Sequence, residues 1–374
     1  MLDSNRKKIT TIQSAIFIST IILGMGVLTL PRNVTEDTQG QDGWISVILA
    51  TLILLFMGWL ITRLNRYYPD KTFFQYSQVI FGKWIGNLAN LIFIAYLLVT
   101  AGYELRGMAE VTRFYLLPMT PPAITISLMV FAGIYLMTGG IVAIARVFEI
   151  LLPITLFFFF VVLSTSFTVF EWRNMMPVMG MGVEPVIKGI HGSALTLSGY
   201  EFMLVLNAFM QRKHEAFKAI TTGIVVPALF YVIIVIVVVG GLGPDQTVTL
   251  TFPTIEVIRS YELTGIFFER YEVFLLSVWL MQIFATYVGM QYVFCLGLSQ
   301  MTGKNIRYFI YGASPIIFFI SFLPEDINEF FALGTILVHI ELVVVFIIVP
   351  AALVIAWIRN RRSKQHHPSK RRST

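Results

Sequence analysis

Ten apolar runs, each long enough to cross a lipid bilayer, constrain the fold of this chain more than any other sequence feature. The runs lie near residues 10–30, 44–62, 85–105, 121–138, 146–169, 187–210, 217–240, 268–294, 307–323 and 328–357. A bilayer-spanning helix needs roughly 20 mostly apolar residues. Only 13% of the 374 residues are charged, against about 25% in soluble proteins. The sequence therefore predicts an all-α membrane protein with ten transmembrane helices.

The placement of lysine and arginine predicts how these helices are oriented. Cytoplasmic loops of membrane proteins are enriched in both residues. Of the 27 present, 20 fall on the predicted side that holds both termini. The seven on the other side are Arg32, Arg106, Arg113, Arg173, Lys188, Arg259 and Arg270. We therefore expect cytoplasmic termini, and the net charge of +6 reflects this topology and gives no reason to expect nucleic acid binding.

The runs also predict the domain organisation. We expect one transmembrane domain over residues 1–357, with a first group of five spans at about 10–169 and a second at about 187–357. Residues 358–374 form a basic cytoplasmic tail. A polybasic segment beside a membrane gains roughly 1 kcal/mol per basic residue from anionic lipids, so membrane lipids are expected partners.

The first run carries a break in its middle. Gly24 and Gly26 flank Met25 there, and each interior glycine lowers helix propensity by roughly 1 kcal/mol relative to alanine. A broken helix exposes backbone N–H and C=O groups that lipid cannot satisfy, so it must face protein or a polar cavity. One interpretation is that these groups hold a polar ligand. The other is close helix packing through small residues.

The sixth run repeats this pattern at the corresponding position of the second group. It places Leu197, Ser198, Gly199, Tyr200 and Glu201 in mid-span. Interrupted helices at corresponding positions of two halves are typical of a transporter-type binding site. The pairing therefore favours the ligand interpretation over packing alone.

An amino acid ligand would use the two breaks in different ways. We expect its carboxylate to meet free N–H groups and the positive end of a half-helix around Met25. We expect its ammonium group to meet carbonyls around Leu197, Ser198 and Gly199. On this hypothesis glycine is needed at both breaks because the ligand approaches the backbone closely, leaving no room for a Cβ.

The third run brings further polar groups to membrane depth. Tyr96, Tyr103 and Arg106 are spaced to share one helix face, and Glu104 lies beside them. Ionisable groups inside a membrane usually face the bundle interior or a cavity. We therefore add Tyr96 and Glu104 to the candidate site. The alternative is that Glu104 and Arg106 lie at the outer interface and are simply solvated.

Features of other site types are missing. Cys295 is the only cysteine, so no disulfide can form within the chain. The five histidines have no metal-ligand spacing, and we expect no cofactor. His339 and Glu341 are two residues apart in the tenth run and so face different sides of a helix; we do not expect them to form a relay. The sequence shows no nucleophile–base pattern of an enzyme.

Several motifs resemble known families. Gly24-Met25-Gly26-Val27 resembles the first-helix element of the amino acid–polyamine–organocation transporter superfamily, and residues 197–201 resemble its sixth-helix element. Three further stretches are similar to the B subunit of bacterial spore germinant receptors. They are Phe81-Gly82-Lys83-Trp84-Ile85-Gly86, Leu117-Pro118-Met119-Thr120-Pro121 and Arg146-Val147-Phe148-Glu149-Ile150-Leu151-Leu152-Pro153.

This resemblance covers essentially the whole chain and has definite implications. It implies a five-plus-five inverted repeat with broken helices 1 and 6 in the inner membrane of an endospore. It implies a subunit that binds a germinant, often an amino acid, and works with an A subunit and a lipoprotein C subunit. A true amino acid symporter remains an open alternative, because both functions would use one pocket.

The resemblance also bears on ion coupling. Thr286 and Tyr287 in the eighth run are candidate site residues, and Thr286 would face the first break where some relatives hold sodium. The alternative is a Thr286 hydroxyl bonded to its own helix. Some proton-coupled relatives carry a lysine in the fifth span. Residues 147–170 of this chain contain none, which argues against proton-coupled pumping by that route.

Overall fold

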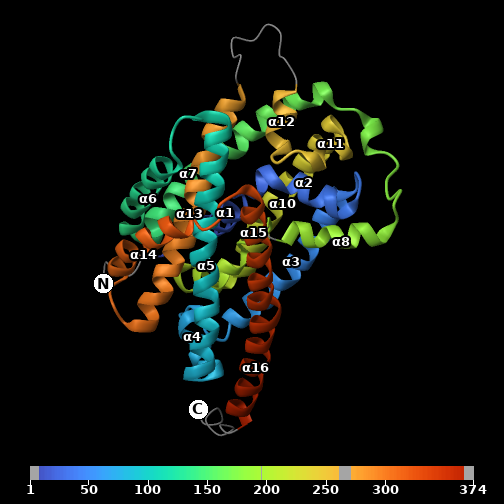
Figure 1. Ribbon diagram of the computed structural model, residues 1–374. Helices are drawn as coiled ribbons and strands as arrows, with labels where there is room; N and C mark the ends of the chain where they lie inside the picture. Colours follow the sequence, from blue (N-terminus) through green and yellow to red (C-terminus); the bar gives the residue numbers. More distant parts are fainter. Residues whose placement is uncertain (1–7, 195, 261–270, 366–374) are drawn as a thin grey trace.

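A computed structural model of the chain describes residues 8–194, 196–260 and 271–365. Figure 1 shows that these residues are almost entirely helical. The α-helices are α1 (Thr11–Ile22), α2 (Gly26–Thr38), α3 (Gly43–Asn65), α4 (Phe73–Phe81), α5 (Lys83–Val111), α6 (Pro122–Thr138), α7 (Gly140–Thr165), α8 (Val183–Ala194), α9 (Met203–Leu206), α10 (Ala216–Leu242), α11 (Pro244–Thr249), α12 (Pro253–Arg259), α13 (Tyr271–Thr302), α14 (Ile306–Ile320), α15 (Ile327–Leu342) and α16 (Val349–Gln365).

The helices confirm an all-α membrane protein. Within the described residues, six helical segments are long and apolar enough to cross a bilayer, and α1 with α2 makes a seventh if the bent pair is one span. Three shorter apolar segments are Pro122–Thr138, Tyr200–Phe209 and Ile306–Ile320. Each of the ten runs predicted from hydropathy thus contains helix, because apolar composition is a strong local signal of a spanning segment.

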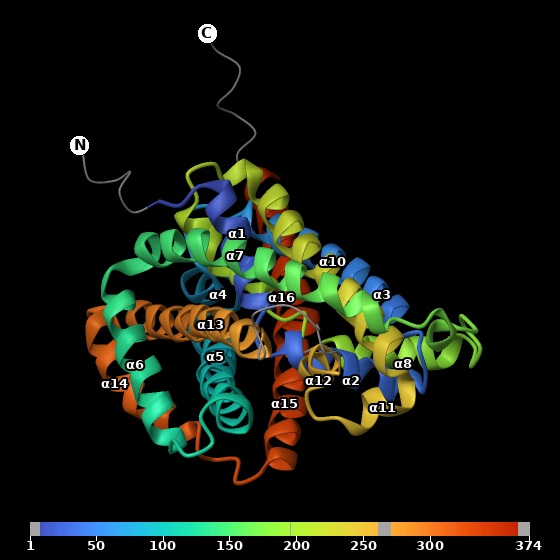
Figure 2. The ribbon, with the colours of Figure 1, turned by 90° about the horizontal axis from the view of Figure 1, so that it is seen from above.

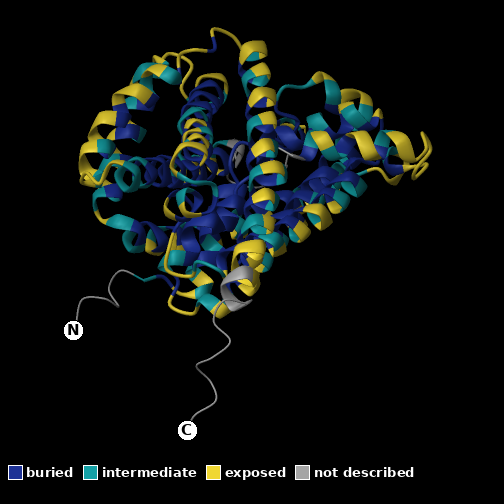
Figure 3. Ribbon diagram, turned by 90° about the horizontal axis from the view of Figure 1, so that it is seen from below, coloured by how far each residue is buried: buried dark blue, intermediate teal, exposed yellow. Residues whose placement is uncertain are grey.

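The first broken span lies at the centre of the bundle. α1 packs against α10, α7 and α13, while α2 packs against α8. The long helix α5 contacts both α13 and α15 (Figures 1 and 2). The helix faces turned toward one another are buried, and the outward faces carry the exposed residues (Figure 3). The broken segment is therefore enclosed by other helices, as unsatisfied backbone at membrane depth requires.

Residues 33–38 are helical although they lie beyond the first apolar run. α2 runs on to Thr38 and ends where Gln39 adopts a left-handed conformation with φ of 52°. Thr35 and Thr38 are buried in this turn, and the Thr38 hydroxyl donates to the carbonyl of Val34 at 2.7 Å. Contact with α8 therefore extends the helix through a polar sequence that hydropathy alone assigns to solvent.

An aromatic stretch at residues 67–83 follows the second span. Its helix α4 is too short to cross a bilayer. However, Phe73, Phe74 and Tyr76 are at most 1% exposed. The Tyr76 hydroxyl donates to Oδ1 of Asn65 at 3.2 Å. This stretch is part of the core, where its rings pack against α5.

Candidate functional site

The first span breaks where the glycines predicted it. α1 ends at Ile22, α2 begins at Gly26, and the two helices are bent by 58°. Two carbonyls of the last turn of α1 are satisfied by side chains from other spans. The Tyr231 hydroxyl donates to the carbonyl of Ile22 at 2.6 Å, and Nε2 of Gln282 donates to the carbonyl of Thr20 at 2.7 Å. Neighbouring helices thus support the break.

The sixth span is also broken at the predicted position. α8 ends at Ala194, and a helical turn resumes at Tyr200. Gly199 has φ of 131°, a conformation that residues with a Cβ rarely adopt. Its N–H donates to Oε2 of Glu201 at 2.7 Å. The carboxylate of Glu201 therefore fixes the start of the second half-helix.

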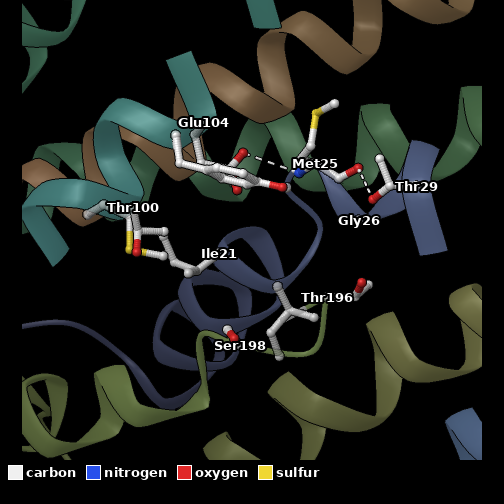
Figure 4. Close-up of a pocket in the computed structure, with 12 residues that line it drawn as sticks. Ile21, Met25, Gly26, Thr29, Thr100, Glu104, Thr196 and Ser198 are labelled. Atoms are coloured by element: carbon white, nitrogen blue, oxygen red, sulfur yellow. Dashed lines mark hydrogen bonds between the residues drawn. The ribbon is translucent and has the colours of Figure 1, made fainter. Parts of the chain in front are cut away.

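The two breaks meet at one small cavity of about 20 Å³ (Figure 4). α5 and α13 complete its walls. The lining residues are Ile21, Ile22, Gly24, Met25, Gly26, Thr29, Thr100, Tyr103, Glu104, Thr196, Ser198 and Met290. A cavity needs about 10–15 Å³ to hold a single water molecule, and ligand pockets usually measure hundreds of Å³. In this conformation the cavity is closed around space for about one water.

Glu104 reaches directly into the first break. The N–H of Met25 donates to its Oε2 at 3.2 Å (Figure 4). The Glu104 side chain is buried, with the residue 7% exposed. The alternative that Glu104 and Arg106 are simply solvated is wrong, since Arg106 is also only 8% exposed. Arg106 pairs with Glu110 at 2.9 Å, so it does not neutralise Glu104.

The three glycines are packed against protein atoms. A Cβ on Gly24 would lie 2.9 Å from Oε1 of Glu104, and one on Gly26 would overlap the methyl group of Thr196. A Cβ on Gly199 would lie 2.8 Å from Cγ2 of Ile21. Glycine at these positions therefore lets the two breaks approach one another. In this conformation the packing interpretation accounts for all three.

A second buried carboxyl cluster lies beside the sixth-span break. The Tyr96 hydroxyl donates to Oε1 of Glu201 at 3.3 Å, and the Ser198 hydroxyl donates to Oε2 of Glu341. Glu201, Glu341 and Tyr200 lie close to one another. Both glutamates are at most 3% exposed. This cluster joins α5, the sixth-span break and α15.

Glu341 is the residue that our sequence reasoning missed. We expected no relay between Glu341 and His339. The expectation that they face different sides of the helix is confirmed, because His339 is exposed and Glu341 is buried. The signal was available, since any ionisable residue in mid-span is a candidate functional residue. Its partner Ser198 lies 143 positions away in the sequence, beyond any local pattern.

The remaining predicted site residues lie at varying distances from the cavity. Leu197 is fully buried beside it but is not among the lining residues. The Thr286 hydroxyl lies 3.1 Å from the carbonyl of Thr20 and 3.2 Å from that of Gln282, so it bonds both the last turn of α1 and its own helix. Tyr287 is turned toward Gly133 on α6. From α13, Met290 lines the cavity instead.

A wider cavity opens on the other side of Tyr103. It measures about 380 Å³ and is lined by groups from α2, α8 and α15, among them Arg32, Glu36 and Asp37. Tyr103 lines both cavities and stacks on Phe330 with ring centroids 4.2 Å apart. We call this wider space the vestibule. It is a polar cavity next to the small central cavity.

The fold and the paired breaks define a helical membrane protein of transporter type. Solved transporters share this architecture. A structure of MhsT in complex with L-phenylalanine matches with a TM-score of 0.66 at 13% identity, covering 94% of this chain and 99% of that chain. Mhp1, a nucleobase-cation-symport-1 family transporter, matches with a TM-score of 0.66 at 13% identity, covering 99% of this chain and 85% of that one.

Within this class, the chain belongs to the spore germination protein family, whose model matches residues 8–330. It is 40% identical to spore germination protein YndE of Bacillus subtilis over 96% of this chain and 99% of that protein. It is 35% identical to spore germination protein A2 of the same organism, over 86% and 88%. GerLB of Bacillus cereus is 27% identical over 94% and 95%. The resemblance seen in the motifs is confirmed.

Proposed function

We propose that this chain is the germinant-binding transmembrane subunit of a spore germination receptor and senses a small nutrient, such as an amino acid. One observation carries the proposal. Two helix breaks, far apart in sequence, meet at one buried cavity that polar groups from α5 also line. Of the predicted residues, Gly24, Met25, Gly26, Glu104 and Ser198 line it. A packed structural subunit needs no such convergence.

The proposed architecture follows from the same segments. Within the described residues, the seven candidate spans, with the bent α1–α2 pair as one, and the three shorter apolar segments together make ten. We propose that they form a five-plus-five inverted repeat, with halves at about 10–169 and 187–357 in one domain. Both termini would be cytoplasmic, and the protein would lie in the inner membrane of the endospore.

Signalling would begin with opening of the central cavity. A ligand shifts a conformational equilibrium only by its differential affinity for the two states. Because the cavity of about 20 Å³ cannot hold an amino acid, a bound ligand would stabilise a more open arrangement of the breaks. An A subunit and a lipoprotein C subunit would respond to that change.

Thermal stabilisation of the purified full chain tests the proposal. A ligand that binds only the folded state at 100 times its Kd adds about 2.7 kcal/mol of stability. Amino acids, sugars and nucleosides would be screened for a rise in melting temperature. We expect at least one of them to raise it. The absence of any stabilising compound would contradict the proposal.

Transport of an amino acid is the second candidate function. The architectural likeness to MhsT, whose structure holds L-phenylalanine, favours it. Receptor and symporter would use the same cavity, so binding cannot separate them. Uptake of a radiolabelled ligand into vesicles that contain the purified chain would distinguish the two functions. Accumulation inside the vesicles supports the symporter, whereas binding without accumulation supports the receptor.

A further inference from the structure

The Glu104 carboxylate occupies the place where we expected a ligand carboxylate to bind. It accepts the N–H of Met25 at the first-span break, at 3.2 Å. It also lies against the open side of Gly24, where a Cβ would come within 2.9 Å of Oε1. Figure 4 shows this contact at the edge of the central cavity. The expected anion site is therefore filled by the protein itself.

This carboxylate retains unused capacity to accept hydrogen bonds. Within residues 8–194, 196–260 and 271–365, Met25 is its one hydrogen-bond donor, and it forms no ion pair. A carboxylate offers about four lone-pair sites. The nearest basic residue on its helix, Arg106, contacts Glu110 and the carbonyl of Glu325. The cavity therefore presents a buried acceptor without a cationic partner.

Electrostatics determines whether a ligand carboxylate or a ligand ammonium group can lie beside Glu104. In a low-dielectric interior, like charges at contact distance repel strongly, and opposite charges attract equally strongly. A ligand carboxylate beside Glu104 would bring a second acidic group to the Met25 N–H that Glu104 already accepts, and the two groups could not both be ionised without strong repulsion. An ammonium group would instead pair with the ionised form of Glu104 and donate to its unused lone pairs. This carboxyl group therefore favours the opposite ligand orientation to the one predicted from the backbone alone.

The geometry points to a specific ligand class: we propose that the central cavity takes a small primary amine, whose ammonium group pairs with Glu104 and which needs no carboxylate of its own. This inference rests on the proposed germinant-binding function and reverses the ligand orientation expected from the sequence. Amino acids are within the class, bound by their ammonium group, and so are their amides.

The rest of the cavity fits such a ligand. Thr100, Thr196 and Ser198 line it. The hydroxyl groups of Thr100 and Ser198 already donate, to the carbonyl of Tyr96 and to Glu341, and each can still accept a hydrogen bond from a neutral polar group. Ile21 and Met290 supply apolar wall for a small side chain. No basic side chain is among the lining residues, so the described cavity wall offers no charged partner for a carboxylate.

Charged groups also line the vestibule. They include the carboxylates of Glu36 and Asp37, the guanidinium of Arg32 and the imidazole of His191. Arg32 also lies over the ring of Phe331, 5.1 Å from the centroid. Tyr103, which lines both spaces, separates the vestibule from Glu104.

A panel of matched ligands tests the proposal on the purified full chain. The probes are L-amino acids, the corresponding amino acid amides, which lack the carboxylate, and the N-acetyl amino acids, which lack the ammonium group. D-Glucose and inosine serve as neutral probes. Melting temperature against probe concentration gives each affinity. We expect the amide of a binding amino acid to retain its affinity and the N-acetyl derivative to lose it.

Two variants connect this preference to the carboxylate. Glu104→Gln should raise the half-saturating concentration of the amine probes by about tenfold or more, as expected for loss of a buried charge partner. Glu149→Gln is the matched control, because Glu149 is exposed and lies outside the cavity. If Glu104→Gln does not fold, the comparison of amides with N-acetyl derivatives in the unsubstituted chain still decides the question.

The outcomes separate this inference from the function on which it rests. Binding of amino acids and N-acetyl amino acids but not of amides would overturn the ammonium orientation and leave the germinant-binding function intact. Binding of glucose or inosine alone, or unchanged affinity in Glu104→Gln, would overturn it in the same way. If no probe binds, the proposed function fails and this inference fails with it.

Discussion

The hydroxyl of Ser198 donates a hydrogen bond to Oε2 of Glu341, and this bond links the sixth-span break to α15. Both residues are at most 6% exposed. A buried donor–acceptor pair of this kind holds two elements together more firmly than its net energy implies, because breaking it leaves a desolvated group without a partner. The position of the break is therefore coupled to the tenth span.

Removal of this donor should destabilise the protein. Ser198→Ala leaves the Glu341 carboxylate with one donor fewer in a buried place, and we expect a loss of about 1–3 kcal/mol in the free energy of unfolding. Thermal melting in detergent measures it. Ser277→Ala is the control, since the Ser277 hydroxyl is exposed and bonds its own helix at the carbonyl of Val273. Equal melting of the two variants would contradict the coupling.

The Tyr96 hydroxyl should contribute to the same cluster through Glu201. Tyr96→Phe removes the 3.3 Å hydrogen bond with little change in volume. We expect a loss of about 1 kcal/mol in stability and a reduced ligand response. A double-mutant cycle with Glu201→Gln isolates the pair, and Tyr308→Phe, at an exposed ring, is the control. Additive effects of the two cluster variants would rule out a direct interaction.

Ligand binding should not require sodium. The carbonyl of Thr20, beside the first break, already accepts Nε2 of Gln282 at 2.7 Å and the Thr286 hydroxyl at 3.1 Å. Amide and hydroxyl donors thus satisfy the backbone at the position where the family resemblance suggested a cation. We expect the same affinity in sodium chloride and in choline chloride. A large loss of affinity in choline would show that a cation site forms there.

Bulk at either break should disrupt folding. A side chain on Gly26 would overlap Thr196, and one on Gly199 would meet Ile21 and require an unfavourable φ. We therefore expect Gly26→Val and Gly199→Val to lower both protein level and melting temperature. Gly312→Val is the control, because a Cβ there meets nothing within 4 Å. Normal stability with lost ligand response would instead favour direct contact between glycine backbone and ligand.

Both termini should face the cytoplasm. Cys295 is replaced to give a background without cysteine, and new cysteines are introduced at Ser4 and Ser369. The cytoplasmic orientation is expected because lysine and arginine are enriched on the side that holds both termini. In intact cells both cysteines should resist membrane-impermeant thiol reagents and react once the membrane is permeabilised. Labelling of either position from outside would overturn the orientation.

The sequence by itself determined the class of protein, the helical segments and the positions of the two breaks. Hydropathy and helix propensity are local properties. Runs of apolar residues therefore predict the helical segments, and the glycines at 24, 26 and 199 predict the breaks. The family resemblance was also visible in short motifs. Hydropathy did not predict helix over residues 33–38, because a polar segment can be helical when a neighbouring helix supports it.

Only the tertiary structure decided how charged groups are paired inside the bundle. Glu104 meets Met25 across 79 positions, and Ser198 meets Glu341 across 143. No local pattern encodes such contacts, because they depend on which helices pack together and at what depth. The first contact changes the expected ligand orientation. The Met25 N–H that was expected to meet a ligand carboxylate already donates to Glu104, a contact that only the packing of α5 against the first break creates.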